Sequence, residues 1–207
     1  MLALQPGAEA ELLSIDLSHY TDDLGKGRLA AAVANLYSDA ITEEDVVVLS
    51  GVDAVIMDTM TALVEPGACV SVQSPEYPPL RNVAEWRGGS GSVTQWVPCS
   101  GEVGAGWDLS VCATAPAQGG ADVIVATLPH SPFGWSPSEE WLQALVKGAA
   151  DNGQTLIVDE IYRGIDLTDD GTGLLPSACE LSETAVVFGG LAKTYGLTGQ
   201  SKQTPLP

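Results

Sequence analysis

The 207-residue chain has few basic side chains. It contains 8 Lys and Arg residues against 27 Asp and Glu residues, so its formal net charge is −19. Nucleic acids and anionic membrane surfaces both bind proteins through positive patches, and a chain this acidic offers little from which to build one. We therefore expect neither nucleic acid nor a membrane surface as a partner.

Cysteine and histidine are scarce as well. The chain has four Cys and two His residues, and no two cysteines have the CxxC spacing of a zinc site, so we expect no metal site. The first residues lack the basic segment and continuous apolar stretch of a signal peptide, and no apolar run approaches the roughly 18 residues of a membrane span. We expect a cytoplasmic protein whose cysteines are reduced and mainly fill the core.

Hydrophobic residues make up 45% of the sequence, which indicates a globular fold despite the charge. At roughly 150 residues per domain, the length corresponds to one domain or one and a half. Several short apolar runs are continuous rather than alternating, as in strands whose two faces are both covered. The runs of strand length are Val46–Leu49, Cys69–Gln73, Ser92–Val97, Asp122–Thr127, Thr155–Val158 and Ala185–Phe188.

Helical patterns lie between these runs. Lys26–Tyr37 and Ser138–Ala150 each place their apolar residues on one face of a helix, and Ala54–Val64 is a third helical stretch. Strands that alternate with helices predict an α/β fold with a mostly parallel sheet. Pro98–Gly120, rich in Gly, Ala and Pro, is predicted to be a long loop.

The start of one predicted helix carries a capping signal. Ser136 and Glu139 have the spacing of a capping box, in which each side chain bonds the backbone of the other residue. Pro137 between them fits the first turn, where no backbone N–H is needed.

Three polar features follow predicted strands, at the edge where open α/β sheets bind ligands. They are Gly51–Asp53, Asp159 with Tyr162 close behind, and Lys193. A carbonyl cofactor needs a lysine amine, a carboxylate for a pyridine nitrogen, and a helix N-terminus for a phosphate. Each residue also has an ordinary explanation: Lys193 as a surface charge, Asp159 as a helix cap, and Tyr77 as a packing residue.

The order and spacing of five motifs resemble the large domain of class I/II aminotransferases, the pyridoxal-phosphate enzymes of fold type I. The resemblance runs from about Ile15 to Gly199. The motifs are Gly51 with Pro66-Gly67, Ser74-Pro-Glu-Tyr77-Pro, Leu128-Pro-His-Ser-Pro-Phe-Gly134, Asp159-Glu-Ile-Tyr162 and Leu191-Ala-Lys193-Thr-Tyr-Gly-Leu-Thr-Gly199.

This resemblance implies a three-layer α/β sandwich like the large domain of aspartate aminotransferase. Residues 1–14 are then an N-terminal extension, residues 15–199 a partial cofactor-binding large domain, and residues 200–207 an unstructured tail unlike the family. The small domain and the last strands of the large domain are missing from the pattern. We therefore expect an incomplete domain whose end is truncated, alternatively spliced or frameshifted.

The resemblance also implies a role for each matching residue. Lys193 falls where the family's lysine forms the internal aldimine and moves a proton at the substrate's α-carbon. Asp159 matches the carboxylate that pairs with the pyridine nitrogen, and Tyr162 matches the phenol that bonds the ring's O3′ oxygen. Tyr77 matches the aromatic residue that stacks on the ring.

Other matches concern the phosphate and the oligomer. The backbone of Gly51, Val52 and Asp53 falls at the phosphate, and Ser131 takes the place of an asparagine that touches O3′ and the substrate carboxylate. Tyr20 resembles a tyrosine that reaches the phosphate of the neighbouring subunit, which implies a homodimer.

The departures from the family gather around the phosphate. Asp53 stands where a hydroxyl or amide is usual, Gly190 and Ala192 stand where Ser or Thr is usual, and Ser201 stands where a clamping arginine is expected. A serine cannot make the bidentate bonds of an arginine to phosphate, and a carboxylate repels it. The resemblance therefore implies an intact ring site with a weakened phosphate site.

The family reaction is the transfer of an amino group from an amino acid to a 2-oxo acid. Two alternatives remain open from the sequence. A lyase or an enzyme similar to ACC synthase uses the same residues. An inactive relic of the fold, acting as a binding or dimerisation module, fits the weakened phosphate site and the missing small domain.

Overall fold

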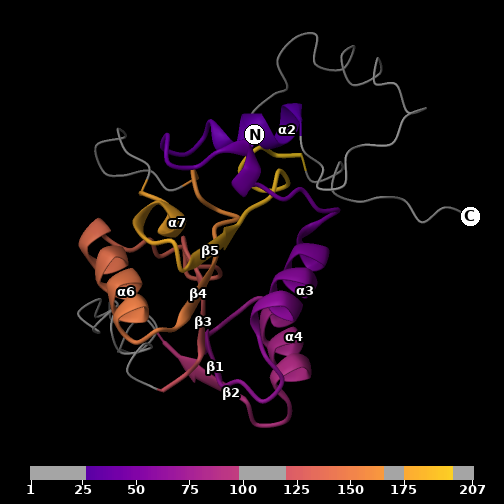
Figure 1. Ribbon diagram of the computed structural model, residues 1–207, viewed down its shortest axis with the longest axis vertical. Helices are drawn as coiled ribbons and strands as arrows, with labels where there is room; N and C mark the ends of the chain where they lie inside the picture. The colour runs from indigo at the N-terminus through magenta and orange to yellow at the C-terminus, as the bar shows by residue number, and fades with distance from the viewer. Residues whose placement is uncertain (1–26, 98–119, 166–174, 198–207) are drawn as a thin grey trace, which may run out of the picture. The chain divides into compact units, whose positions relative to one another are not determined.

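The computed structural model describes residues 27–97, 120–165 and 175–197 (Figure 1). The chain divides into two compact units. The larger unit is Gly51–Gly190, and the smaller unit joins Met1–Ser50 with Leu191–Pro207. The predicted loop Pro98–Gly120, apart from Gly120, and the predicted tail 200–207 lie outside the described residues.

A five-stranded sheet forms the centre of the larger unit. Its order is β2-β1-β3-β4-β5, and every neighbouring pair is parallel. Five of the six predicted strands are confirmed to within one residue at each end. The strands are β1 Val70–Gln73, β2 Val93–Trp96, β3 Val123–Thr127, β4 Thr155–Asp159 and β5 Ala185–Phe188.

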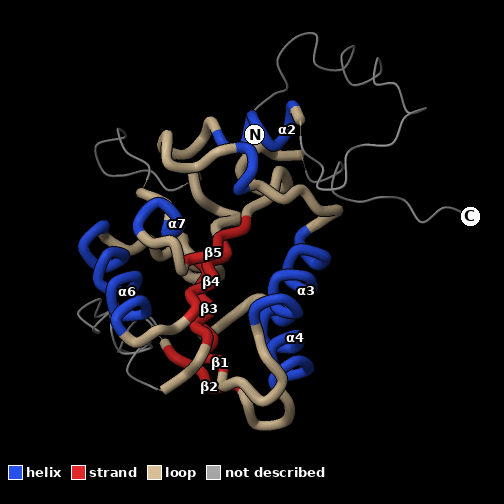
Figure 2. Tube along the Cα trace, viewed as in Figure 1, coloured by secondary structure: helices blue, strands red, loops and turns tan. Residues whose placement is uncertain are grey.

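Helices cover both faces of this sheet (Figure 2). Helices α3 (Val52–Leu63) and α4 (Pro78–Gly88) pack on one face, where their apolar residues form one core cluster with the strands. Helices α6 (Glu139–Asp151) and α7 (Ala178–Leu181) pack on the other face in a second cluster. The described part of the larger unit is therefore the expected three-layer α/β sandwich.

Strand β3 explains why the apolar runs are continuous. Val123 and Val125 pack toward α3 and α4, whereas Ile124 and Ala126 pack toward α6. All five residues of β3 are buried because successive side chains point to opposite faces and both faces are covered.

Helix α6 begins at a different cap from the one that the sequence predicts. Ser138 is its N-cap, and the Ser138 Oγ accepts a hydrogen bond from the Trp141 N–H at 3.2 Å. Ser136 Oγ is buried and has no partner among the described residues. Pro137 therefore lies before the cap and not in the first turn, so the predicted capping box is wrong.

The described part of the smaller unit contains α2 (Arg28–Ala34) and the 3₁₀ helix Glu43–Asp45. Helix α2 is shorter than the predicted Lys26–Tyr37. The predicted strand Val46–Leu49 is wrong, since no described segment pairs with it and Val47 is 57% exposed. A strand needs a neighbour to bond its backbone, and an apolar run alone does not supply one.

The remaining global expectations concern cysteines, metals and membranes. Cys69 is exposed and Cys179 is half-buried, so the expectation that cysteines fill the core is wrong for Cys69, which lies just before β1 at the rim of the sheet. Within the described ranges, no group of side chains has the make-up of a metal site. No helix in the described part of the chain is long and apolar enough to span a membrane.

Candidate functional site

The path of the chain through the sheet reverses at β1. Strand β2 pairs with one side of β1, whereas β3, β4 and β5 follow in order on the other side. The carboxyl ends of β1 and β3 therefore flank a topological switch point, where open α/β sheets bind ligands. Gln73 ends β1, and its side-chain oxygen accepts a hydrogen bond from the Thr127 N–H at 2.6 Å. The Gln73 Nε2 is buried and has no partner among the described residues.

Asp159 ends β4 at the same edge. It is 3% exposed, and its Oδ1 accepts a hydrogen bond from the Ile161 N–H at 3.0 Å. Burial raises the pKa of Asp159 to about 6, although that hydrogen bond lowers it. A nearby cation stabilises the charged form of such a buried carboxyl group. The group is therefore suited to hold a proton on a ring nitrogen.

Tyr77 and Asp53 meet beside this carboxyl group. Asp53 lies in the first turn of α3, and the Tyr77 hydroxyl donates a hydrogen bond to its Oδ1 at 3.1 Å. Burial raises the pKa of Tyr77, and the bond to Asp53 and the charges of Asp53 and Asp159 raise it further. Side chains from α3, from the N-cap of α4 and from β4 therefore share one site.

The N-terminus of α3 presents uncapped backbone. Its N-cap is Gly51, at a φ of 91°, where a residue without Cβ is favoured. No side chain caps this end, so its first N–H groups lack an intrahelical or capping partner. Val52 begins the helix and is half-buried. This end of α3 can thus accept an anion through its backbone and dipole.

The turn after β3 carries Ser131, which is half-buried, and His130, which sequence reasoning missed. His130 is 2% exposed, and its Nε2–H donates to the Pro75 carbonyl oxygen at 2.9 Å. Burial lowers the pKa of His130. The bond joins the loop after β3 to the loop that carries Tyr77. The available signal was the position of His130 just beyond a mainly apolar strand.

Glu160 is a second buried carboxyl group that sequence reasoning did not assign. It accepts hydrogen bonds from the Ser177 hydroxyl at 2.8 and 2.9 Å and from the Ala178 N–H at 3.0 Å. Arg163 Nε lies 3.8 Å from Glu160, and the Arg163 guanidinium lies 3.6 Å from Glu180. Burial raises the pKa of Glu160 to about 7, while these hydrogen bonds and the charge of Arg163 lower it.

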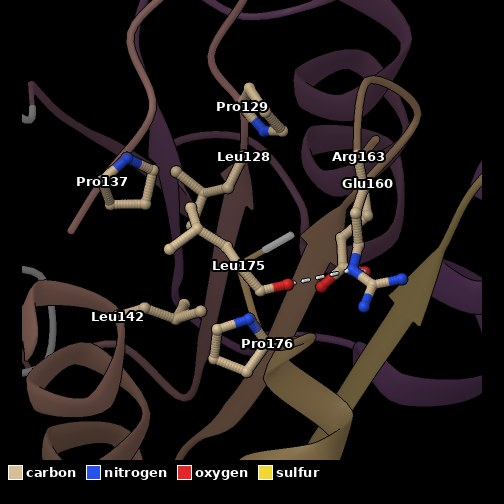
Figure 3. A pocket seen from close by; sticks show the side chains of 8 residues that line it. All are labelled: Leu128, Pro129, Pro137, Leu142, Glu160, Arg163, Leu175 and Pro176. Carbon is tan, nitrogen blue, oxygen red and sulfur yellow. Dashed lines mark hydrogen bonds and ion pairs between the residues drawn. The ribbon is translucent and has the colours of Figure 1, made fainter. Parts of the chain in front are cut away.

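These bonds anchor the turn that follows Asp159 onto α7. Figure 3 shows the Arg163 Nε–H directed at the Leu175 carbonyl oxygen, 3.3 Å away. Tyr162 lies in this anchored turn and is half-buried. The turn also closes one side of a small, mainly apolar pocket, which is lined by Leu128, Pro129, Pro137, Leu142, Glu160, Arg163, Leu175 and Pro176.

Three further predicted residues do not belong to the larger unit. Lys193 belongs to the smaller unit, where it is exposed in a turn whose Gly196 N–H donates to the Lys193 carbonyl oxygen at 3.2 Å. Tyr20 and Ser201 lie outside the described residues. The larger unit thus brings together the predicted residues Asp53, Tyr77 and Asp159.

Comparison with known proteins identifies relatives of the chain. The model of the family described as aminotransferase class I and II matches residues 7–200. The chain is 28% identical over 193 residues to a probable chloroplastic LL-diaminopimelate aminotransferase of Oryza sativa subsp. japonica, covering 88% of this chain and 40% of that protein. It is 29% identical over 167 residues to the glutamate-pyruvate aminotransferase AlaA of Escherichia coli K12, covering 77% of this chain and 38% of that protein.

A solved structure extends the similarity to the fold. The crystal structure of an aminotransferase from Mycobacterium tuberculosis matches with a TM-score of 0.75 and 25% identity, covering 93% of this chain and 49% of that one. The chain therefore spans about half the length, or less, of these matched proteins.

Proposed function

The chain belongs to the family of class I and II aminotransferases. From this premise we propose that it binds pyridoxal phosphate and acts in amino-group transfer from an amino acid to a 2-oxo acid. The observation that carries the proposal is the buried Asp159 carboxyl group near Tyr77 at the carboxyl edge of the sheet. The names of the relatives in rice and Escherichia coli support the reaction class.

The described residues fit the ring of this cofactor better than its phosphate. Asp159 offers a buried acceptor to a protonated pyridine nitrogen, and Tyr77 offers an aromatic face that is 45% exposed. Gln73 adds a buried amide nitrogen without a partner among the described residues. The phosphate end is served by the uncapped N-terminus of α3, but the Asp53 carboxylate stands in its first turn.

When bound, the cofactor withdraws electrons from the substrate's α-carbon and makes its proton labile. Asp159 keeps the ring nitrogen protonated, which maintains this electron withdrawal. Tyr77 would pack on the ring, and Tyr162 and Ser131 would orient its O3′ side. Lys193 would supply the primary amine for the cofactor's aldehyde and would carry the proton at the α-carbon. The backbone of Gly51–Asp53 would hold the phosphate.

The proposal includes assembly into a homodimer, to which Tyr20 contributes across the interface. Large apolar side chains on the surface of the larger unit support association, among them Trp86 at 66% exposed. Sedimentation velocity of the chain tests this part: a dimer at micromolar concentration is expected, and a monomer at all concentrations would contradict it.

Lys193→Ala tests the function directly. The chain is mixed with pyridoxal phosphate, reduced with borohydride and mapped by peptide mass spectrometry. We expect one strongly modified lysine, Lys193, and its loss in the variant. Removal of the amine removes the nucleophile, whereas the fold is kept because Lys193 is exposed.

Lys147→Ala is the matched control. Lys147 pairs with Asp151 on the surface of α6, so this variant should keep the modification of Lys193. Equal modification of both lysines in the wild-type chain, or none at Lys193 in a folded chain, would reject the proposed function.

A further inference from the structure

The Asp53 carboxylate is held in a defined position. It lies in the first turn of α3, and the Tyr77 hydroxyl donates to its Oδ1 at 3.1 Å. The bond fixes one negative charge next to the aromatic ring and beside the uncapped N–H groups of the helix. Asp53 thus already occupies part of the positive end of the α3 dipole.

No described cation of the larger unit neutralises this charge. Arg81, Lys147 and Arg163 form their ion pairs with other carboxylates. Arg87 lies in the last turn of α4, ten residues after Tyr77, and ten residues of helix span about 15 Å. The charge of Asp159 acts on Tyr77 as well, so a second carboxyl group lies near the ring that bonds Asp53.

We propose that Asp53 is a specificity-determining residue that lowers the preference of this site for a phosphorylated cofactor over its phosphate-free form. The proposal rests on the proposed function and concerns the phosphate end of the same site. A dianionic phosphate at the N-terminus of α3 meets the fixed carboxylate, whereas pyridoxal, which has the same ring and aldehyde, does not. Asp53 therefore opposes the phosphate without affecting recognition of the ring.

The Asp53→Asn variant removes the charge and keeps the shape. The amide oxygen still accepts the Tyr77 hydroxyl, so the position of the aromatic ring is preserved. The measurement is the dissociation constant of the full chain for pyridoxal phosphate and for pyridoxal, by equilibrium dialysis. We expect the variant to bind pyridoxal phosphate about tenfold more tightly, with pyridoxal affinity unchanged, because a like charge a few Å away is removed.

Asp58→Asn is the matched control. Asp58 is an exposed residue of the same helix, and its replacement changes the net charge by the same amount. In Asp58→Asn, the ratio of the dissociation constants for pyridoxal phosphate and pyridoxal should equal the wild-type ratio. Asp53→Ser is a second variant, which removes the charge and leaves a hydroxyl that can cap the helix.

A measurement without cofactor tests the contact between Asp53 and Tyr77. The Asp53 charge raises the pKa of the Tyr77 phenol, so ultraviolet titration should show a lower phenol pKa in Asp53→Asn, with Tyr77→Phe identifying the signal. An unchanged ratio of dissociation constants in both Asp53 variants, with both aldehydes bound, overturns the inference and leaves the proposed function standing. Absence of binding of either aldehyde to the wild type and to both variants overturns both proposals.

Discussion

Two consecutive carboxyl groups at the end of β4 are both buried, yet they differ in how far the sequence reveals them. Asp159 is predictable, because a carboxylate that ends an apolar strand stands where ligands bind. Glu160 is not, because its partners Ser177 and Ala178 come from a helix that follows a long connection. His130 is similar, since its bond to the Pro75 carbonyl joins two loops 55 residues apart. The spacing of residues along the chain predicts local contacts, whereas the contacts of Glu160 and His130 form only when the sheet is assembled.

Glu160→Gln should stabilise the chain at alkaline pH. The folded-state pKa of Glu160, about 7, exceeds its ordinary value of 4.5, so the folded state holds the proton more tightly. This stabilisation is complete below pH 4.5 and is lost as the pH rises through 7. At 1.4 kcal/mol per unit, the variant should gain roughly 2–4 kcal/mol over the wild type at alkaline pH. Urea unfolding at about pH 5 and pH 8 measures the difference.

Glu65→Gln is the control for that change, because Glu65 is exposed. It should leave the pH dependence of the free energy of unfolding as in the wild type. The amide oxygen introduced by Glu160→Gln can still accept the bonds from Ser177 and Ala178, so this variant and the wild type should differ far less in stability near pH 5 than at pH 8. A gain at pH 8 no larger than that of Glu65→Gln would contradict the assigned burial of Glu160.

At the scale of elements, the start of α6 is capped by Ser138 and not by Ser136, which the sequence predicts. Ser138→Ala removes the cap of the Trp141 N–H and should lower the free energy of unfolding by about 1 kcal/mol. Ser136→Ala removes a buried hydroxyl without a described partner and should cost less than about 0.5 kcal/mol or stabilise the chain. Urea unfolding of both variants measures these two changes in the free energy of unfolding. A larger loss of stability for Ser136→Ala than for Ser138→Ala would contradict the Ser138 cap and support the capping box predicted from the sequence.

The strands show what an apolar run can and cannot predict. β1, β3 and β4 are buried on both faces, and their continuous runs locate them almost to the residue. Val46–Leu49 is also a continuous apolar run, but no strand lies beside it in the described residues, so its backbone stays out of the sheet. Helix α4 gives a weaker signal, since Pro78 and Pro79 begin it and polar residues interrupt it. Whether an apolar run forms a strand therefore depends on whether another strand lies beside it in the fold.

At the scale of the whole molecule, the charge of −19 sets a response to salt. Repulsion among carboxylates opposes the compact state. The ion pairs Arg81–Glu85 and Lys147–Asp151 are exposed and contribute little against it. Raising sodium chloride from about 0.01 to 0.1 M shortens the screening length from roughly 30 to 10 Å. The melting temperature should therefore rise by roughly 2–4 °C, equivalent to about 1 kcal/mol.

Potassium chloride at equal ionic strength should reproduce this rise, because screening depends on the concentration of charge and not on the identity of the cation. Sucrose stabilises proteins by exclusion from their surface, so it should raise the melting temperature equally at both salt concentrations. It therefore identifies any part of the rise that is not electrostatic. A melting temperature that falls with both salts would mean that attraction within ion pairs, including the largely buried pairs of Arg163 with Glu160 and Glu180, outweighs the repulsion of the acidic surface. Such buried pairs are screened much less than exposed charges, and for this reason we expect the repulsion to dominate the salt response.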